Sequence, residues 1–177
     1  KDTPTLTIYS ARSEHLIKPL FDAFTKQTGI PIAYSTNKAG VLIQKLKQEG
    51  EFTPADILLT VDAGNLWFAK KSNLLQSVSS STLNQNIPSQ YRDPENHWFG
   101  FSLRTRAIVY HQDKVTATEL LSYEDLASQK WKNRLVLRTS KKIYNQSLVS
   151  MLFSHHGFEK TATIISGWVN NLAIPPL

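Results

Sequence analysis

The stretch LTIYSARSEHLIKPLFDAFTKQTGIPIAY, residues 6–34, decides the fold class. Its first apolar run, 6–9, is typical of a buried strand, and apolar residues at helical spacing follow over 16–24. Gly29 predicts the end of that helix, and 30–34 predicts a second strand. Strand, helix and strand in this order indicate a parallel sheet covered by helices.

The same alternation continues outward from this stretch. Residues 40–49 predict a second helix, with Val41, Leu42, Ile43 and Leu46 on its inner side. The apolar run 57–59 predicts a third strand, and 66–69 begins a third helix. A long polar connection, rich in Ser, Asn, Pro and Gln, follows over 77–96. The first half is therefore expected to be one α/β unit.

A second α/β unit is expected in the remaining residues. It has too few predicted strands to close a sheet of its own. Its expected elements are extended segments at 98–101 and 107–110, a short helix at 123–127, a strand at 135–137, and helices at 145–153 and 161–169.

Composition excludes several functions and leaves others open. The 177 residues include no cysteine, which excludes disulfides, thiolate zinc sites and a cysteine nucleophile. The net charge of +6 invites a nucleic-acid interpretation, but Lys and Arg are spread along the chain and no recognition module is legible. No apolar run reaches the roughly 18 residues that span a bilayer. No nucleophile–base pair, acidic dyad or phosphate loop stands out, so an enzyme is not expected.

Three segments are expected at the carboxyl ends of strands, where ligands bind in such sheets. They are 10–15, 36–40 and 139–145, and each is rich in small polar residues and precedes a helix. Their free backbone N–H groups could bind an anion. The alternative interpretation of each segment is ordinary helix capping.

Individual side chains suggest what such a site could hold. Arg104 or Arg106 could bind an oxyanion with its forked guanidinium, or both could be solvated charges on an edge strand. Tyr144 begins a helix, and its phenolate would suit a hard trivalent cation, although a loop tyrosine is more often packed or at the surface. The five histidines have no metal-site spacing, since the adjacent His155 and His156 would diverge on a helix.

Taken together, several segments match a known family in its order. They are 6–12 (LTIYSAR), 24–30 (FTKQTGI), 54–62 (PADILLTVD), 98–110 (WFGFSLRTRAIVY), 130–132 (KWK) and 144–147 (YNQS). The chain resembles the periplasmic ferric-iron-binding proteins of bacterial ABC importers over nearly all of its length.

This resemblance implies an α/β, two-lobed periplasmic-binding-protein fold, with the first lobe mostly present and the second lobe incomplete. The implied domains are 1–100 (N-terminal lobe), 101–110 (crossing strand and hinge) and 111–177 (partial second lobe). The implied cargo is Fe³⁺, held with a synergistic anion, usually carbonate, and delivered to a membrane permease. The implied location is the periplasm, with the signal peptide already removed.

The resemblance also implies roles for single residues. Tyr144 matches a phenolate ligand to iron, and Arg104 matches the arginine that holds the anion. Relatives place a His, with or without an adjacent Tyr, where Ser13 and Glu14 stand. The possible additional cleft residues are therefore Ser13, Glu14 and His15, and Glu14 or His15 could substitute for the missing ligand. Relatives with a Glu ligand have it where Val61 stands, which favours the subclass that uses tyrosines and an anion.

The family continues past the segment matching 170–172 into a paired-tyrosine motif, so the chain is expected to be a truncated form. Two other functions remain open at this point. One is a protein that binds an anion or anionic small molecule without metal, through Arg104 and the helix N-termini. The other is a shortened domain that acts through protein contacts alone, for example as a dimer paired through the exposed edges of its incomplete lobes.

Overall fold

The computed structural model describes residues 4–177. Contacts divide the chain into two compact units, 1–102 and 103–177. Each unit has its own packed core and is described by itself below.

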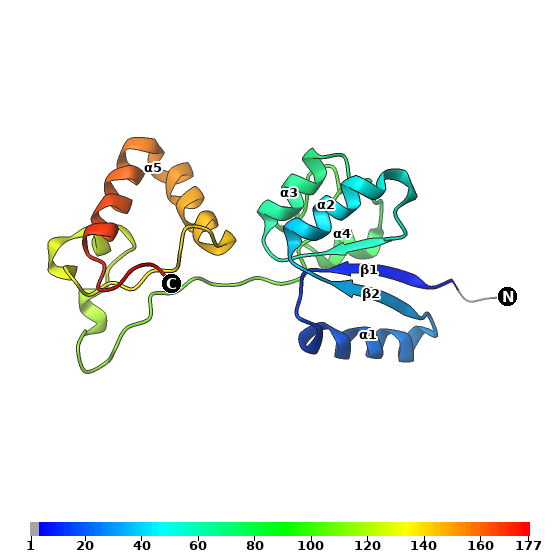
Figure 1. Ribbon diagram of the computed structural model, residues 1–177, viewed down its shortest axis with the longest axis horizontal. Helices are drawn as coiled ribbons and strands as arrows, with labels where there is room; N and C mark the ends of the chain where they lie inside the picture. The colour runs from blue at the N-terminus through cyan, green and yellow to red at the C-terminus, as the bar shows by residue number, and fades with distance from the viewer. Residues whose placement is uncertain (1–3) are drawn as a thin grey trace. The chain divides into compact units, whose positions relative to one another are not determined.

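Unit 1 is a three-stranded parallel sheet with helices on both faces (Figure 1). The strand order is β2-β1-β3, so the first strand of the chain lies in the centre. The elements are β1 (Leu6–Ser10), α1 (Glu14–Thr28), β2 (Ile32–Thr36), α2 (Ala39–Glu49), the 3₁₀ turn η1 (Gly50–Phe52), β3 (Ile57–Leu59), α3 (Ala63–Lys71), α4 (Ser81–Asn86) and the 3₁₀ turn η2 (Ser89–Tyr91).

The alternation of side chains along β1 builds two cores in unit 1. Ile8 packs with Ile17 and Phe21 of α1 on one face of the sheet. The next residue, Tyr9, points to the other face and packs with Leu42 of α2. This arrangement confirms the predicted α/β class, because a central strand buried on both faces needs helices on both sides.

Details of the predicted elements differ. The second strand begins at Ile32 instead of residue 30, since Pro31 has no N–H to donate to a sheet. Val41 was predicted on the inner side of its helix but is 49% exposed, and Leu16 and Leu20 of the apolar pattern over 16–24 are 56% and 62% exposed. The apolar stripe of each helix is thus wider than the surface that the three-stranded sheet covers.

The third helix begins at Ala63, because the Asp62 side chain accepts a hydrogen bond from the N–H of Gly64 at 2.9 Å.

The polar connection over 77–96 is more ordered than its composition indicates. Ser80 caps α4 in the same way, accepting from the N–H of Leu83. Residues 77–96 therefore contain a helix and a tied loop in place of a continuous linker.

Unit 2 packs around one long helix. Its elements are the 3₁₀ turns η3 (Ala117–Glu119), η4 (Glu124–Ala127) and η5 (Gln129–Trp131), followed by α5 (Ile143–Asn170). The core consists of Leu126, Trp131, Leu135, Leu148, Leu152, Ile164 and Trp168. The indole N–H of Trp168 donates to the carbonyl of Tyr123 at 2.9 Å, which fixes α5 against η4.

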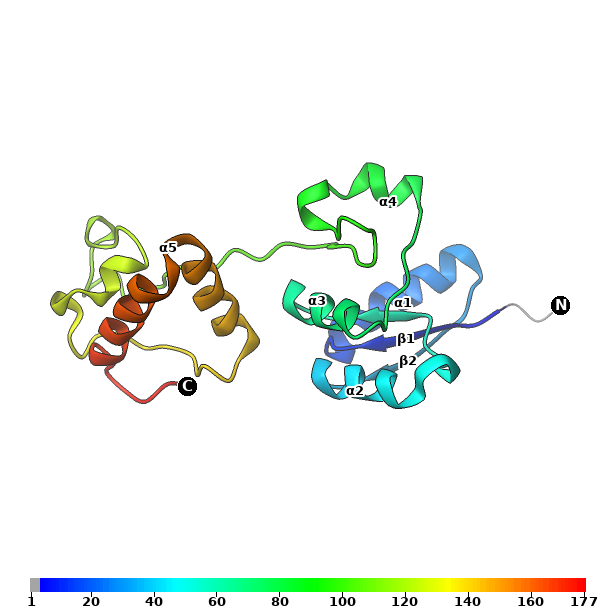
Figure 2. The same ribbon diagram turned by 90° about the horizontal axis from the view of Figure 1, so that it is seen from above.

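The two predicted C-terminal helices are the two arms of α5. Gly157 separates them with φ 77° and ψ 176°, a backbone conformation that is essentially restricted to glycine. Figures 1 and 2 show α5 bent into two arms. The predicted short helix at 123–127 is the 3₁₀ turn η4.

The strand predicted at 135–137 and the extended segments predicted at 98–101 and 107–110 form no strand ladder within the described residues. The segments 98–101 and 135–137 each contribute a single bridge, Arg92 to Phe99 and Leu135 to Leu172. Residues 101–110, expected as a crossing strand, contain no hydrogen-bonded strand at all. The physical reason is the lack of a paired neighbour, because a strand is stable only in a ladder. Within residues 4–177, no helix has the length and apolarity to cross a membrane.

Candidate functional site

Tyr144 lies in the first turn of α5, where the helix begins without a side-chain cap. Lys142 occupies the N-cap position but accepts no hydrogen bond from the helix. Within the described chain, the backbone N–H groups of Ile143 and Tyr144 donate to no protein acceptor. These groups give the helix start a positive partial charge.

Arg104 reaches the same place from the stretch that opens unit 2. Its Nη1 donates to the phenol oxygen of Tyr144 at 3.0 Å. The centre of its guanidinium lies 5.4 Å from the centroid of the tyrosine ring. Arg104 is exposed and Tyr144 is half-buried, so the pair is open to solvent and to a ligand. The structure thus brings together the two residues that the sequence singled out.

Arg138 is a third member of this group that the sequence analysis missed. Its guanidinium carbon is 5.8 Å from the Tyr144 ring centroid. Its backbone carbonyl accepts from Nδ2 of Asn145, which ties the loop before α5 to the helix start. Its position in the sequence could have identified it, because Arg138 directly follows the 135–137 run, at the carboxyl end of a predicted strand where ligands bind.

This group of side chains, which we call the Tyr144 site, is strongly positive. Arg104 and Arg138 form no ion pair with a described residue. Lys141 and Lys142, predicted as a solvated loop, are exposed beside them in sequence. An arrangement of one phenol, two guanidiniums and free helix N–H groups suits an anion, alone or beside a metal ion that the phenolate binds.

Ser13, Glu14 and His15 belong to unit 1, where they begin α1. All three are exposed, and Ser13 at the N-cap position makes no capping hydrogen bond with its side chain. Oε1 of Glu14 accepts from the phenol of Tyr34 at 2.8 Å, and this hydrogen bond raises the pKa of Tyr34. Glu14 therefore already has one partner within its own unit.

The capping alternative can be tested against the three loops. The helices α1, α2 and α5 follow these loops, and none of their N-cap side chains, Ser13, Lys38 and Lys142, accepts a hydrogen bond from its helix. By contrast, Asp62 and Ser80 cap α3 and α4. Side-chain capping is thus found at helices outside the three segments and not inside them.

A second polar cluster lies in unit 1. Asp93, Glu95 and His97 bring possible ligand atoms within 4.8 Å of one another. However, Nζ of Lys70 lies 2.9 Å from a carboxylate oxygen of both acidic residues. An ammonium group already pairs with both carboxylates of this cluster, so it is a structural ion-pair network.

The buried member of that network is Asp93, which is 5% exposed. Burial opposes its ionisation, but hydrogen bonds from Lys70 and His97 outweigh burial and lower the pKa of Asp93 to about 2. Its carboxylate also accepts from the backbone N–H groups of Glu95 and His97 at 3.2 Å. His97 was isolated by sequence spacing, yet its ring lies 3.0 Å from Asp93.

Relatives of this chain carry iron-related names. It is 41% identical to iron uptake protein A1 of Synechocystis over 99% of its length, and 32% identical to the Fe(3+)-binding periplasmic protein of Serratia marcescens over 94%. A solved Trichodesmium FutA, in complex with iron and citrate ligands, superimposes with a TM-score of 0.92 at 45% identity and 98% coverage of this chain.

The chain spans about half the length of these relatives: 50% and 49% of the two proteins and 55% of the FutA chain. The relatives bear the names of binding and uptake proteins, which points away from an enzyme. The family of bacterial extracellular solute-binding proteins matches residues 41–174, more than half of these 177 residues. The chain therefore belongs to the bacterial extracellular solute-binding proteins.

Proposed function

We propose that this chain is part of a periplasmic solute-binding protein that delivers ferric iron to an ABC importer. In this proposal the phenolate of Tyr144 is a ligand to Fe³⁺. Arg104 holds a synergistic anion, with carbonate the expected one, beside the iron. The observation that carries the proposal is the hydrogen bond of 3.0 Å between Arg104 and the Tyr144 phenol at an uncapped helix start.

The chemistry of the donor atoms supports this assignment. A phenolate is a hard, anionic oxygen ligand, which suits a hard trivalent cation. The Fe³⁺ ion needs negatively charged ligands, and its anion needs a frame of positively charged or hydrogen-bond-donating groups around its oxygens. Arg104 and the N–H groups of Ile143 and Tyr144 offer that frame to the oxygens of a bound carbonate.

The rest of the proposed assembly follows from the relatives. Serratia marcescens and Synechocystis relatives are named for Fe(3+) binding and iron uptake, and the Serratia protein is named periplasmic. We accordingly propose a periplasmic location and a membrane permease as partner. The roles that the resemblance implies for Ser13, Glu14 and His15 stay predictions.

The proposal is tested by iron titration. Because the chain spans half of its relatives, the titration uses a fusion in which the unmatched part of Synechocystis iron uptake protein A1 follows residue 177. Ferric citrate is added in bicarbonate buffer, and the tyrosinate-to-iron charge-transfer band is followed in the visible range. We expect Tyr144→Phe to weaken iron binding at least tenfold and to shift the band.

The matched control is Tyr110→Phe, since Tyr110 is in the same unit and makes no hydrogen bond through its phenol with a described residue. This variant should bind iron like the unmodified fusion. If the fusion develops no band, or if both variants bind iron equally well, the assignment of iron to Tyr144 is wrong.

The positive charge of the Tyr144 site favours one other function. Two guanidiniums and an uncapped helix start could bind an anionic small molecule without metal. Calorimetry with inorganic phosphate in metal-free buffer distinguishes this anion-binding function from iron binding. Phosphate binding that Arg104→Gln abolishes and Tyr144→Phe leaves intact would favour the anion-binding protein.

A further inference from the structure

The two arginines of the Tyr144 site are held in different ways. The guanidinium of Arg104 is fixed by its own hydrogen bond to the Tyr144 phenol at 3.0 Å. The guanidinium carbon of Arg138 lies 5.8 Å from the centroid of the same ring, but this group forms no hydrogen bond or ion pair with a described residue. The position of Arg138 over the ring therefore depends on the backbone from which its side chain extends.

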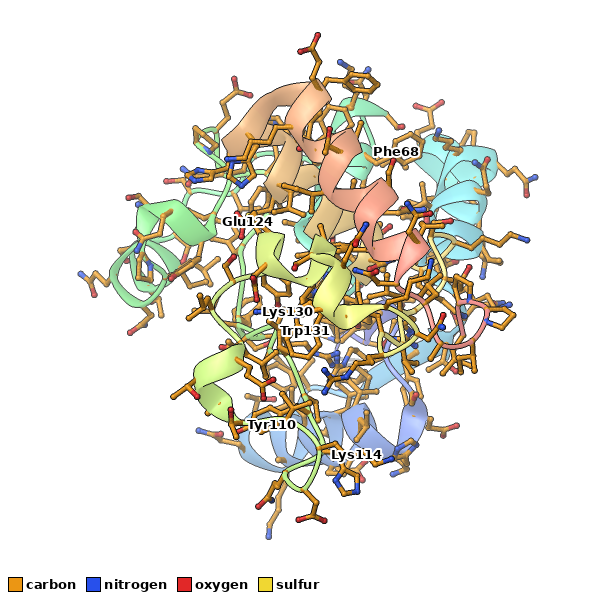
Figure 3. The ribbon with its side chains drawn as sticks, turned by 90° about the vertical axis from the view of Figure 1, so that its left-hand side faces the viewer. Phe68, Tyr110, Lys114, Glu124, Lys130 and Trp131 are labelled. Carbon is orange, nitrogen blue, oxygen red and sulfur yellow. The ribbon has the colours of Figure 1, made fainter. Side chains whose placement is uncertain are left out.

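Two other cations lie over an aromatic ring in unit 2, and both are fixed by their charged ends. Arg134 lies 4.9 Å from the ring centroid of Trp131, and its Nη2 donates to a backbone carbonyl at 2.9 Å. Lys130 lies 5.2 Å from the same centroid and is paired with Asp125 at 2.8 Å; Figure 3 labels Lys130 and Trp131. Arg138 lacks an anchor of this kind.

The backbone of Arg138 is anchored to the start of α5 instead. Nδ2 of Asn145, in the first turn of the helix, donates to the carbonyl of Arg138 at 2.9 Å. The residues before and after Arg138 are both hydrogen-bonded to Leu177. Asn145 is half-buried and directly follows Tyr144. One turn of helix thus carries both the ring and the amide that fixes the backbone of the cation over it.

The neighbouring amide serves as a comparison within the same turn. Nε2 of Gln146 donates to the carbonyl of Ser140 at 3.0 Å, so it ties the same loop two residues further on. Gln146 is exposed, whereas Asn145 is half-buried. A tie that only closes the loop could come from either amide, but only the amide of Asn145 contacts Arg138.

We propose that Asn145 is a positioning residue, whose amide holds Arg138 over the ring of Tyr144, where Arg138 tunes the phenolate that binds iron. Its effect on iron rests on the function proposed for the Tyr144 site. Fixing the backbone reduces the freedom that a long, exposed side chain loses when it settles over a ring. A positive charge over the ring face stabilises the electrons of a phenolate. It therefore raises the energy that moves an electron from the phenolate to Fe³⁺, which is the energy of the charge-transfer band.

The position of Arg138 is measured in the full chain without iron. Side-chain protons of an arginine over an aromatic ring are shifted upfield in NMR by the ring current, and those of Arg138 are assigned by their loss in Arg138→Gln. We expect Asn145→Leu to lose this upfield shift, since leucine has a similar size but no N–H to donate. Asn145→Asp should lose it too, because a carboxylate cannot donate to a carbonyl. Gln146→Leu should keep it, because the amide of Gln146 bonds to Ser140.

The effect on iron is measured in the fusion with the Synechocystis segment. Asn145→Leu and Arg138→Gln should each move the maximum of the charge-transfer band to longer wavelength, by on the order of 5 nm. The double variant should show the shift of Arg138→Gln alone, because Asn145 acts through Arg138. The maximum is read from protein that has bound iron, so a loss of folded protein lowers the intensity of the band and leaves its position unchanged.

Three results would overturn the proposal. The first is an upfield shift of the Arg138 protons that survives in both Asn145 variants, the second is its equal loss in Gln146→Leu, and the third is an additive band shift in the double variant. If the fusion develops no band while the NMR results are as expected, the proposed iron function is wrong and the positioning of Arg138 by Asn145 stands.

Discussion

Arg104 and Tyr144 are 40 residues apart, yet a guanidinium nitrogen of one lies 3.0 Å from the phenol oxygen of the other. Both residues belong to unit 2, so their contact depends only on the packing of that unit. Arg138 contacts the ring of the same tyrosine but makes no hydrogen bond to its oxygen. This difference between the two arginines predicts a difference in function.

Replacing Arg104 with Gln should affect anion-dependent iron binding more than replacing Arg138. A hydrogen bond to a charged group contributes about 1.5–3 kcal/mol, which corresponds to roughly tenfold or more in affinity. In the fusion with the Synechocystis segment, Arg104→Gln should therefore raise the bicarbonate concentration for half-maximal iron loading about tenfold. The measurement is the charge-transfer band as a function of bicarbonate.

Arg138→Gln is the comparison. It should change the bicarbonate concentration for half-maximal iron loading about threefold or less, since it loses only a contact with the ring face of Tyr144. Equal effects of the two variants would mean that the hydrogen bond to the phenol has no special role. If the unmodified fusion, Arg104→Gln and Arg138→Gln all show the same bicarbonate dependence, Arg104 is not part of the anion site.

The residues of the Tyr144 site could be predicted from the sequence only where they lie in segments that carry the family resemblance. Arg104 and Tyr144 lie in the 98–110 and 144–147 stretches that carry the family resemblance. Arg138 has no such marker. Its place beside the tyrosine results from the turn between residue 137 and α5, a three-dimensional feature that periodicity cannot encode.

The fold was predictable where pairing is local. β1, β2 and β3 are joined by single helices, so each strand finds its neighbour within a few tens of residues. The strands predicted at 107–110 and 135–137 have the right composition but lack a partner between them. Composition indicates the tendency to form a strand, while the ladder depends on which chain lies alongside.

Gly167 of α5 packs directly against Ala127 of η4. A Cβ at position 167 would lie 2.5 Å from the Cβ of Ala127 and 2.9 Å from its carbonyl oxygen. Gly167→Ala should therefore lower the free energy of unfolding of unit 2 by about 1–3 kcal/mol, because the helix must move away. Urea unfolding measures the change in a chain that also carries Trp67→Phe and Trp98→Phe, so that only Trp131 and Trp168 of unit 2 fluoresce.

The double variant Ala127→Gly with Gly167→Ala is the matching control. It removes the Cβ that clashes, so it should recover part of the lost stability through a favourable coupling between the two positions. Additive losses in the double variant would show that the helix position does not depend on this contact.

The two glycines Gly157 and Gly40 should respond oppositely to alanine. Both have open space where the Cβ of an alanine would lie, but Gly157 has φ 77° and ψ 176° whereas Gly40 lies within the helix α2. Gly157→Ala should cost about 1–3 kcal/mol of stability, and Gly40→Ala should add up to about 1 kcal/mol. Far-UV circular dichroism in urea compares them. A stabilising Gly157→Ala would mean that α5 is continuous in solution.

Asp93 should make unit 1 sensitive to acid. Its pKa in the folded chain is about 2, below the ordinary value of 3.8. Because the folded-state pKa is depressed, the stabilisation is complete above pH 3.8 and is lost as the pH falls from 3.8 to about 2. We expect the free energy of unfolding of unit 1 to fall by about 1–2 kcal/mol across this window. Urea unfolding at pH 5 and at successively lower pH measures this change.

Asp93→Asn removes the titrating carboxylate while it keeps the shape of the side chain. This variant should be less stable at pH 5 and should show a flatter dependence on pH between 4 and 2, since Lys70 and His97 lose their buried partner. Glu95→Gln is the control, because Glu95 shares Lys70 but its side chain is 71% exposed. An exposed pair contributes little, so Glu95→Gln should unfold like the unmodified chain at every pH. If Asp93→Asn keeps the full acid dependence of the parent chain, another carboxylate is responsible for it.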